Sequence, residues 1–337
     1  MKKVLFIANT SLHIKLCHIP YLKMFHDNGY IVHVATNSIN DELPCDKQIV
    51  LSLKRYPFSF INFKAIKEIR KLVKEEKYDV ISCHTPMGGF LGRVSVIGTN
   101  YHPLIFYTAH GFHFYKGCKL INYLLYYNIE LFLSKYTTCI LTMNQEDYLR
   151  SKKFKCPTYL INGIGYDPNR LKSEEVAFFN SYFVITYVAE ISKRKNQINL
   201  IKKLNKIDLE KEHIMVLLIG NSLIKNLSKY LKSPNIKHIP FTDNIGYYLK
   251  RSDLVISAST QEGLPLNIIE GMSLNKMIIA TNIRGNRDLI NANNGILVDD
   301  LDSLVREIIK YKNKKKKKII KNDTSKYRID KVIIEVK

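Results

Sequence analysis

The chain has 337 residues, of which 46% are hydrophobic and 24% charged. This is the composition of a globular protein with enough apolar residues for two cores, and it excludes a largely disordered chain. Lysine and arginine number 52 against 30 acidic residues, a formal charge of +22 at pH 7. Such an excess attracts polyanions such as nucleic acid, anionic lipid headgroups or phosphorylated small molecules.

Membrane-spanning and secretory segments are not expected. No apolar run approaches the roughly 20 residues that a transmembrane helix needs. The apolar run Val4–Ala8 is too short for the core of a signal peptide. The six cysteines form no CxxC pair, so neither a zinc motif nor a disulfide framework is indicated. We therefore expect a cytosolic protein.

Short runs rich in valine, isoleucine and phenylalanine alternate with longer amphipathic stretches along the chain. Most runs are continuously apolar, which is typical of parallel strands covered on both faces. Predicted strands are Lys3–Ala8, Ile31–Thr36, Val80–His84, Leu104–Thr108, Thr138–Thr142, Thr158–Ile161, Phe183–Val188, Met215–Ile219, Ile236–Ile239, Leu254–Ser257, Met277–Ala280 and Ile296–Val298.

The segments between these strands predict helices and a break between two domains. Ile61–Glu76 has apolar residues at helical spacing. Strand–helix alternation of this length predicts right-handed βαβ units and parallel sheets. The segment Asn162–Asn169 is rich in glycine, asparagine and proline and indicates a connector. A second strand–helix series opens at Phe183, so we predict two Rossmann-like domains, with ligands at the carboxyl ends of their sheets.

One low-complexity segment, Lys310–Lys318, consists almost entirely of lysine. A solvated helical surface and an adhesive patch for anionic lipid both fit this composition. No helix-turn-helix, zinc finger or aromatic-flanked RNA motif supports binding of nucleic acid.

The stretch Ser257–Met272 carries the most chemical information. Gly263 permits a tight turn after the strand, and Pro265 suits the first turn of a helix. Free N–H groups at such a helix start attract an anion. Glu262 precedes this start, and Glu270 lies two turns into the helix.

We expect the Glu270 side chain to lie on the ligand side if Leu266, Ile269 and Ser273 face the sheet. The two carboxylates then fit a ligand with phosphate in its middle and hydroxyls at both ends, because a carboxylate accepts two hydrogen bonds from a diol. A helix cap followed by a surface glutamate is the alternative interpretation.

The residues Glu262–Glu270 resemble the E-x7-E motif of retaining glycosyltransferases of family 4. Met277–Gly285 resembles the family's next strand and glycine turn, and Asn293–Val298 resembles the strand after it. His84–Gly89 and Tyr107–Gly117 resemble the branch found in bacterial exopolysaccharide and capsule clusters. The His-Gly-Phe-His run in the second of these segments is the most specific signature, and the resemblance covers nearly the whole chain.

The resemblance implies the GT-B fold, an α/β architecture of two Rossmann-like domains whose parallel sheets face each other across a cleft. Residues 1–165 would form the acceptor-side domain and 166–337 the nucleotide-sugar-binding domain with a basic C-terminal segment. By the same resemblance Glu270 holds the ribose hydroxyls and Glu262 holds donor-sugar hydroxyls near the reacting carbon. The helix start at Gly263, Leu264 and Pro265 faces the diphosphate.

A cation is required opposite the leaving diphosphate, because charge accumulates on it as the glycosidic bond breaks. Tyr187–Gln197 resembles the family's G-R-L-x-x-x-K-N pattern and places Lys195 on the phosphate-binding lysine. The family's arginine position is Glu190 here, which is a departure, and Arg194 is the candidate for the second charge. Gly220 and Asn221, which follow a predicted strand, are expected to approach the donor.

Three histidines are candidates in the first domain. His110 follows a predicted strand and matches the family histidine that approaches the donor sugar, where a neutral imidazole can hydrogen-bond a hydroxyl. His113 is a candidate nearer the acceptor, and His13 lies in the loop after the first strand. We therefore group His110 with Glu262 and Lys195 as catalytic candidates and keep His113 and His13 as acceptor or donor contacts.

The run Asp300-Leu301-Asp302 has the D-x-D spacing of metal-dependent glycosyltransferases of the other major fold. Because it precedes the apolar-periodic stretch Leu301–Ile309, we predict that Asp300 caps a helix. Relatives with the GT-B fold generally need no metal, since basic groups and a helix dipole replace it. We expect no metal site and no cofactor besides the nucleoside-diphosphate sugar.

Tyrosine and phenylalanine concentrate between residues 112 and 136, interspersed with lysines. A basic amphipathic helix of this kind fits contact with a membrane interface and a lipid-linked acceptor. Ordinary packing of a helix against the sheet is the alternative.

Together these patterns predict a retaining glycosyltransferase that moves a hexose-type residue from a nucleoside-diphosphate sugar to a lipid-linked oligosaccharide for capsular, exopolysaccharide or O-antigen-type synthesis. We expect it in the cytoplasm, peripheral to the inner face of the cell membrane, with an anionic membrane surface and no nucleic acid as partner. A nucleotide-sugar epimerase or hydrolase on the same fold, and a non-catalytic protein that binds anionic lipid, are the alternatives. The chain is short for the family, so an abbreviated C-terminal crossover helix is expected.

Overall fold

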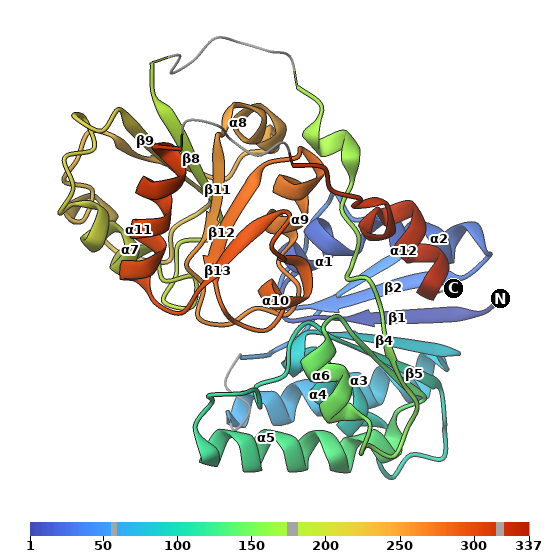
Figure 1. The fold of residues 1–337 in the computed structure, drawn as a ribbon. Coiled ribbons are helices and arrows are strands. Elements are labelled where there is room, and N and C mark those ends of the chain that lie inside the picture. The colour runs from blue at the N-terminus through green and yellow to red at the C-terminus, as the bar shows by residue number, and fades with distance from the viewer. Residues whose placement is uncertain (55–58, 174–180, 315–319, 337) are drawn as a thin grey trace. The chain divides into compact units, whose positions relative to one another are not determined.

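The computed structural model describes residues 1–54, 59–173, 181–314 and 320–336 (Figure 1). The chain divides into two compact units, the first formed by Met1–Ile164 together with the residues from Val332 onward, the second by Gly165–Lys331. The predicted division at residues 165 and 166 lies one residue away. The last residues, which we assigned to the second domain, group with the first unit instead.

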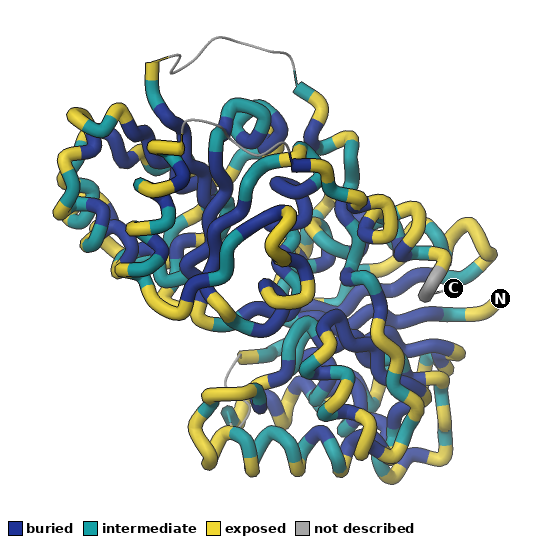
Figure 2. The backbone as a smooth tube through the Cα atoms, in the orientation of Figure 1, coloured by how far each residue is buried: buried dark blue, intermediate teal, exposed yellow. Residues whose placement is uncertain are grey.

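A seven-stranded parallel sheet forms the centre of the first unit, in the order β3-β2-β1-β4-β5-β6-β7. Its strands appear in Figure 2 as mostly buried segments of the backbone. The strands are β1 (Lys3–Ile7), β2 (Ile31–Thr36), β3 (Lys47–Val50), β4 (Val80–His84), β5 (Leu104–Ala109), β6 (Cys139–Thr142) and β7 (Thr158–Leu160).

Helices cover both faces of this sheet. The helices α3, α4 and α5 pack on one face around the core that contains Ile69, Leu91 and Tyr107, and α2 lies over the other face (Figure 1). The helices of the first unit are α1 (Ser11–Cys17), α2 (Ile19–Asp27), α3 (Phe60–Glu76), α4 (Thr85–Val96), α5 (Leu120–Leu133) and α6 (Gln145–Ser151), with a 3₁₀ turn at Ser134–Tyr136.

The second unit is built on a six-stranded parallel sheet in the order β10-β9-β8-β11-β12-β13. Every residue of its strand β9 is buried, as expected for a strand covered on both faces. The strands are β8 (Phe183–Val188), β9 (Ile214–Ile219), β10 (Ile236–Ile239), β11 (Leu254–Ser257), β12 (Met277–Thr281) and β13 (Gly295–Val298).

Two apolar clusters sandwich this sheet. One joins α7 and α11 to the strands through Leu200, Leu218 and Leu304, and the other joins α8 and α9 through Leu249 and Ile268. The helices are α7 (Gln197–Leu204), α8 (Ile245–Arg251), α9 (Leu266–Ser273), α10 (Asn286–Leu289) and α11 (Leu301–Lys312), with 3₁₀ turns at Pro168–Leu171, Leu227–Lys229 and Ser325–Tyr327. The last helix, α12 (Ile329–Val336), begins in the second unit and ends in the first.

All twelve predicted strands are confirmed, with bounds that agree to within one residue. The strand β3 is the exception, because we did not predict it. Its residues Lys47–Val50 are exposed or half-buried at the edge of the sheet, so they lack the continuous apolar run that marks the central strands. The predicted helix at Ile61–Glu76 is α3.

The strand orders locate the place in each unit where a ligand is expected. In each sheet, successive strands are first added on one side of the starting strand and then on its other side. This reversal lies between β1 and β4 in the first unit and between β8 and β11 in the second. Open parallel sheets bind ligands outside the carboxyl ends of the strands at such a switch point, because the loops diverge there and leave a crevice. The residues after these four strands are therefore the candidates for function.

Candidate functional site

In the second unit, the loops after β8 and β11 bring three charged side chains together at the switch point. Glu262 follows β11, and its Oε1 lies 2.5 Å from Nζ of Lys195, which follows β8. Nη1 of Arg194 lies 3.3 Å from the other carboxylate oxygen, Oε2. The sequence prediction that these three residues share a site therefore agrees with this geometry, although they are 68 positions apart at most.

Glu262 is held as a buried carboxylate. Only 6% of its side chain is exposed. Burial by itself would raise the pKa of Glu262, but the positive charges of Lys195 and then Arg194 outweigh it and lower that pKa. The carboxylate is thus ionised at neutral pH, and two cations share it. A ligand anion that approaches this cluster can compete with the Glu262 carboxylate for both cations, while Arg194 also donates to the Gln261 carbonyl oxygen at 3.1 Å.

Neighbouring loops fix the backbone on both sides of this ion-pair cluster. Nε of the buried Arg284 donates to the Glu262 carbonyl oxygen at 3.0 Å. The Tyr187 hydroxyl donates to the Lys195 carbonyl oxygen at 2.7 Å. Gly285 has φ = 77°, and a Cβ there would lie 2.4 Å from the Gly263 carbonyl oxygen, so only glycine lets the two loops approach this closely.

The helix α9 begins directly after this loop. Pro265 occupies its N-cap position and Leu266 is its first residue, so the proline stands one place earlier than in the first turn that we predicted. In the part of the chain that the structure describes, no side chain caps this end, and the first N–H groups of an eight-residue helix have no intrahelical partner. Gly263, Leu264 and Pro265 thus lead into a helix start with the polarity that favours an anion.

Glu270 lies on α9 and is buried, with 5% of its side chain exposed. The Gly271 position faces the sheet, because a Cβ there would lie 3.1 Å from Val255 and Ile278 side-chain atoms. Ile268 and Met272 are buried in the same cluster. Ile269 belongs to this cluster and the half-buried Leu266 packs against it, as expected, whereas Ser273 is half-buried and its hydroxyl donates to the Glu270 carbonyl oxygen.

The charge state of Glu270 differs from that of Glu262. Burial raises the pKa of Glu270 to about 7, against the opposing charge of Arg170, whose Nη1 lies 3.8 Å from Oε1. Arg170 belongs to the 3₁₀ turn Pro168–Leu171 and was not among our candidates. Its position in the connector gave no signal, because a solvated arginine in a turn is common.

Gly220 and Asn221 follow β9, beside the end of β8. Gly220 has φ = 140°, and a Cβ there would lie 2.4 Å from the Ala189 carbonyl oxygen. Asn221 Oδ1 accepts from the Phe241 backbone N–H at 3.2 Å. Gly220 and Asn221 therefore fix the backbone of the loop after β9 against the loops that follow β8 and β10. Glu190, at the family's arginine position, is exposed, whereas Arg194 is the residue that approaches Glu262.

In the first unit, four histidines gather at the switch point between β1 and β4. His13 lies on α1, His18 lies between α1 and α2, His84 ends β4, and His110 follows β5. The His13 ring centroid lies 4.6 Å from that of His110 and 5.1 Å from that of His18. The ring centroids of His18 and His84 lie 3.8 Å apart.

This histidine cluster contains two predicted residues and two that sequence reasoning missed. His13 and His110 meet in it, whereas His113 is exposed and its ring centroid lies 4.8 Å from that of Tyr126, with the two rings tilted by 35°. His18 and His84 are almost fully buried. The signal that could have found them is position, since each adjoins the carboxyl end of a predicted strand or the helix that follows one.

Burial keeps the cluster uncharged. It lowers the pKa of His13 to about 4 and that of His84 to about 3. It also lowers the pKa values of His18 and His110, and the neighbouring histidines lower them further. These imidazoles are therefore neutral at pH 7, each with one N–H donor and one lone pair.

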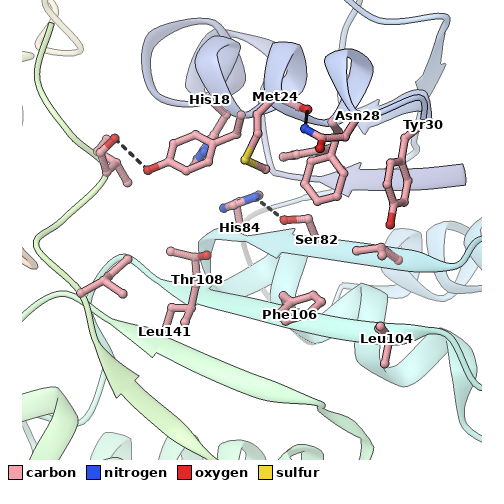
Figure 3. Close-up of a pocket in the computed structure, with 16 residues that line it drawn as sticks. His18, Met24, Asn28, Tyr30, Ser82, His84, Leu104, Phe106, Thr108 and Leu141 are labelled. Carbon is pink, nitrogen blue, oxygen red and sulfur yellow. Dashed lines mark hydrogen bonds between the residues drawn. The ribbon is translucent and has the colours of Figure 1, made fainter. Parts of the chain in front are cut away.

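A largely apolar cavity of about 310 Å³ adjoins the histidine cluster within the first unit. It lies between α2 and the sheet, with Met24 on one side and Phe106, Ser82 and His84 on the other (Figure 3). Ser82 Oγ lies 2.9 Å from Nε2 of His84, as the dashed line in Figure 3 marks. The cavity places apolar surface beside hydrogen-bonding groups.

The D-x-D run and the lysine segment have local roles in the part of the chain described. Asp300 caps α11, as predicted, by accepting from the Ser303 backbone N–H at 2.7 Å, and Asp302 pairs with Lys203 at 2.7 Å. In the segment Lys310–Lys318, Lys310 pairs with Glu307. Residues 315–318 lie outside the described residues.

The aromatic segment divides its side chains between core and surface. Phe112 and Phe114 are buried, and tyrosines of α5 pack against the core of the first unit. The same helix exposes Leu120, Ile121 and Leu124, with 73%, 68% and 50% of their surface accessible. Packing against the sheet and an exposed apolar face thus occur together on one helix. Among the described helices, none is both long enough and apolar enough to cross a bilayer.

Two parallel-sheet units, with an ion-pair cluster at the switch point of the second and a neutral histidine cluster at that of the first, have the architecture of the GT-B fold, and comparison with known proteins agrees. The model of the family "Glycosyl transferases group 1" matches residues 169–326, and that of "Glycosyl transferase 4-like" matches residues 3–144. The chain is 34% identical over 323 residues to "Putative glycosyltransferase EpsD" of Bacillus subtilis, covering 90% of this chain and 84% of that protein. The chain therefore belongs to the glycosyltransferase family that these two models and EpsD represent.

A further relative agrees with this assignment, and solved structures agree with the fold. A "UDP-Gal:alpha-D-GlcNAc-diphosphoundecaprenol alpha-1,3-galactosyltransferase" of Escherichia coli is 26% identical over 74% of this chain and 70% of its own length. The Anabaena protein HepE, solved with UDP and glucose, superposes with a TM-score of 0.70 at 18% identity over 100% of this chain and 94% of that one. WaaG, a glycosyltransferase of lipopolysaccharide biosynthesis, gives 0.71 at 12% identity over 98% and 93%. The predicted GT-B fold is confirmed.

Proposed function

We propose that the chain is a retaining hexosyltransferase that takes a sugar from a nucleoside diphosphate and adds it to a lipid-linked saccharide for capsular, exopolysaccharide or O-antigen-type synthesis. The E. coli relative's name specifies a UDP-sugar donor and a diphosphoundecaprenol-linked acceptor. The HepE structures contain UDP and UDP-glucose. UDP-sugars are therefore the first donors to test.

The observation that carries the proposal is the Lys195–Glu262–Arg194 cluster at the switch point of the second unit. The cations can exchange the buried carboxylate for a diphosphate, which releases Glu262 to accept hydrogen bonds from the donor sugar. The positive end of α9 adds to the same field. Preorganised positive groups of this kind stabilise a leaving group without reorganisation during the reaction.

The proposed reaction is a front-face transfer. The bond between the anomeric carbon and the oxygen of the β-phosphate breaks, and Lys195 with Arg194 stabilises the charge on the departing diphosphate. The acceptor hydroxyl attacks the same face of the sugar, and its proton passes to the diphosphate oxygen. No covalent enzyme intermediate is required, and the cations take the part that a metal has in other glycosyltransferases.

Glu270 is proposed to bind the ribose. Its buried carboxylate can accept hydrogen bonds from both ribose hydroxyls, and these would replace the water that it lacks in the interior. Gly220 and Asn221 are proposed to border the donor. In the first unit, neutral His110 is proposed to hydrogen-bond a sugar hydroxyl, with His13 and His113 as further contacts to donor or acceptor.

We further propose that the first unit meets the cytoplasmic face of an anionic membrane through α5. Leu120, Ile121 and Leu124 offer apolar surface for the interface, and Lys116 and Lys119 are exposed just before the helix. An apolar helix face buried in the headgroup region and lysines that attract anionic lipid are the features of a helix that lies in a bilayer surface. A lipid-linked acceptor would be reached from that position.

A panel of nucleotide sugars tests the proposal. One donor should raise the thermal midpoint of the protein, since a ligand that binds only the folded state stabilises it. The same donor should be consumed only when a lipid-diphosphate-linked saccharide is added. Turnover of donor without acceptor would identify an epimerase or hydrolase instead, and binding of vesicles without any donor response would identify a non-catalytic lipid-binding protein.

A further inference from the structure

We propose that His13, His18 and His110 form a binding site for a late first-row transition-metal ion, with Zn²⁺ the preferred occupant. One ring nitrogen from each of these residues lies within 4.8 Å of those of the other two. The inference goes beyond the proposed transfer reaction, which uses Lys195 and Arg194 at the diphosphate, and it does not depend on that reaction.

The spacing of the three rings matches a tetrahedral ion. With Zn–N distances of about 2.0–2.1 Å, two imidazole nitrogens on one tetrahedral ion lie about 3.4 Å apart and their ring centroids about 5 Å apart. Nε2 of His13 lies 3.3 Å from Nε2 of His18. The three pairs of ring centroids are separated by 4.6, 5.1 and 5.5 Å.

A hydrogen bond between His13 and His18 explains only part of this arrangement. It would account for one close contact, but Nε2 of His110 and Nδ1 of His18 are buried without a hydrogen-bond partner among the described residues. A buried polar nitrogen without a partner is costly, so it calls for an explanation. A shared ion satisfies the unpaired nitrogen of His110 together with the close pair.

The chemistry of the donors favours the same group of ions. Imidazole nitrogen is a preferred ligand of Zn²⁺, Cu²⁺ and Ni²⁺, and three histidines leave a fourth position open for water. The low pKa values of these histidines mean that protons do not compete for the lone pairs at neutral pH. The His84 ring packs against the His18 ring, with 3.8 Å between the ring centroids.

Occupation of the site has a consequence for the proposed reaction. A metal bound to His110 takes the lone pair that would otherwise accept a hydrogen bond from a sugar hydroxyl. Zn²⁺ should therefore inhibit transfer, although the site is outside the second unit. This consequence rests on the proposed role of His110, whereas metal binding itself does not.

The test is titration of the full chain, prepared without a histidine tag, with Zn²⁺ in a calorimeter and with Co²⁺ in a visible spectrophotometer. We expect one ion per chain and the intense visible bands of low-coordinate Co²⁺. The variants His13→Gln, His18→Gln and His110→Gln should each bind Zn²⁺ more than about tenfold more weakly, since even loss of a ligand's hydrogen-bond partner costs about 10- to 100-fold.

Two controls separate this site from other metal binders. His102→Gln replaces an exposed histidine of the first unit, and Cys17→Ser removes the thiol one turn from His13 on α1. Both should leave the Zn²⁺ affinity unchanged. Circular dichroism and the thermal midpoint without metal show whether each variant is folded, and in the parent Zn²⁺ should raise the midpoint. Absence of stoichiometric binding, or unchanged affinity in the folded cluster variants, would overturn the proposal.

Discussion

Replacing Glu270 with glutamine should stabilise the ligand-free protein, and the gain should grow with pH. Burial raises the pKa of this carboxyl from its ordinary value of 4.5 to about 7. Between these values the unfolded chain has released the proton while the folded chain retains it. The parent therefore loses stability as pH rises from 4.5 through 7.

The size of the effect follows from the shift. One pKa unit corresponds to about 1.4 kcal/mol, so a carboxylate that must ionise in this site costs about 3 kcal/mol at pH 8.5 and about 1 kcal/mol at pH 5. Glutamine keeps the shape and carries no charge. The variant Glu270→Gln should thus exceed the parent by about these amounts in free energy of unfolding.

Urea denaturation of parent and variant at pH 5 and pH 8.5 measures this difference. Glu75, an exposed glutamate on α3 with 60% of its side chain accessible, provides the matched control, and Glu75→Gln should change stability by the same small amount at both pH values. A gain from Glu270→Gln that is absent at pH 8.5, or equal at the two pH values, would refute a raised pKa at Glu270.

Three further predictions concern binding, the membrane and the glycine turn. As pH increases toward 7, the affinity for UDP-glucose measured by calorimetry should increase by up to about tenfold per pH unit, and above pH 7 it should level off, because the ribose requires ionised Glu270. The variant Glu270→Gln should bind UDP-glucose weakly at every pH. Leu120→Glu should reduce binding to phosphatidylglycerol vesicles at least about tenfold. The control Leu149→Glu, which replaces an exposed leucine on α6, should not reduce it. An equal loss in both variants would contradict docking through α5. Gly285→Ala should lower the free energy of unfolding by about 1–3 kcal/mol, and by more than Gly98→Ala does. Both glycines have positive φ, but of the two only Gly285 would place a Cβ against a backbone oxygen. Equal losses would show that the contact with the loop is unimportant.

The central strands, and the charged residues that gather after β8 and β11, were predictable from the sequence because their signals are local. A buried parallel strand is a continuous apolar run, and Glu262, Glu270 and Lys195 lie in motifs with fixed spacing. The edge strand β3 has no such run. Its Lys47–Val50 segment forms a strand only because β2 offers a free edge.

The histidine cluster was only half predictable, for a topological reason. His13, His18, His84 and His110 come from four elements spread over nearly a hundred positions, and the sheet order brings β1, β4 and β5 side by side. A single sequence does not display that order. Arg284 and Arg170 were missed for a related reason, since each approaches its glutamate from a loop on a different element.

The most direct test of the proposed transfer site is the activity of Glu262→Gln with the donor identified by the panel and a diphosphoundecaprenol-linked saccharide. The variant keeps the size of the side chain and removes the charge that Lys195 and Arg194 share. Transfer should fall at least about 100-fold, as expected for loss of a group that acts in the transition state, while the affinity for UDP stays within about threefold. Full transfer activity in this variant would contradict the assignment of the site.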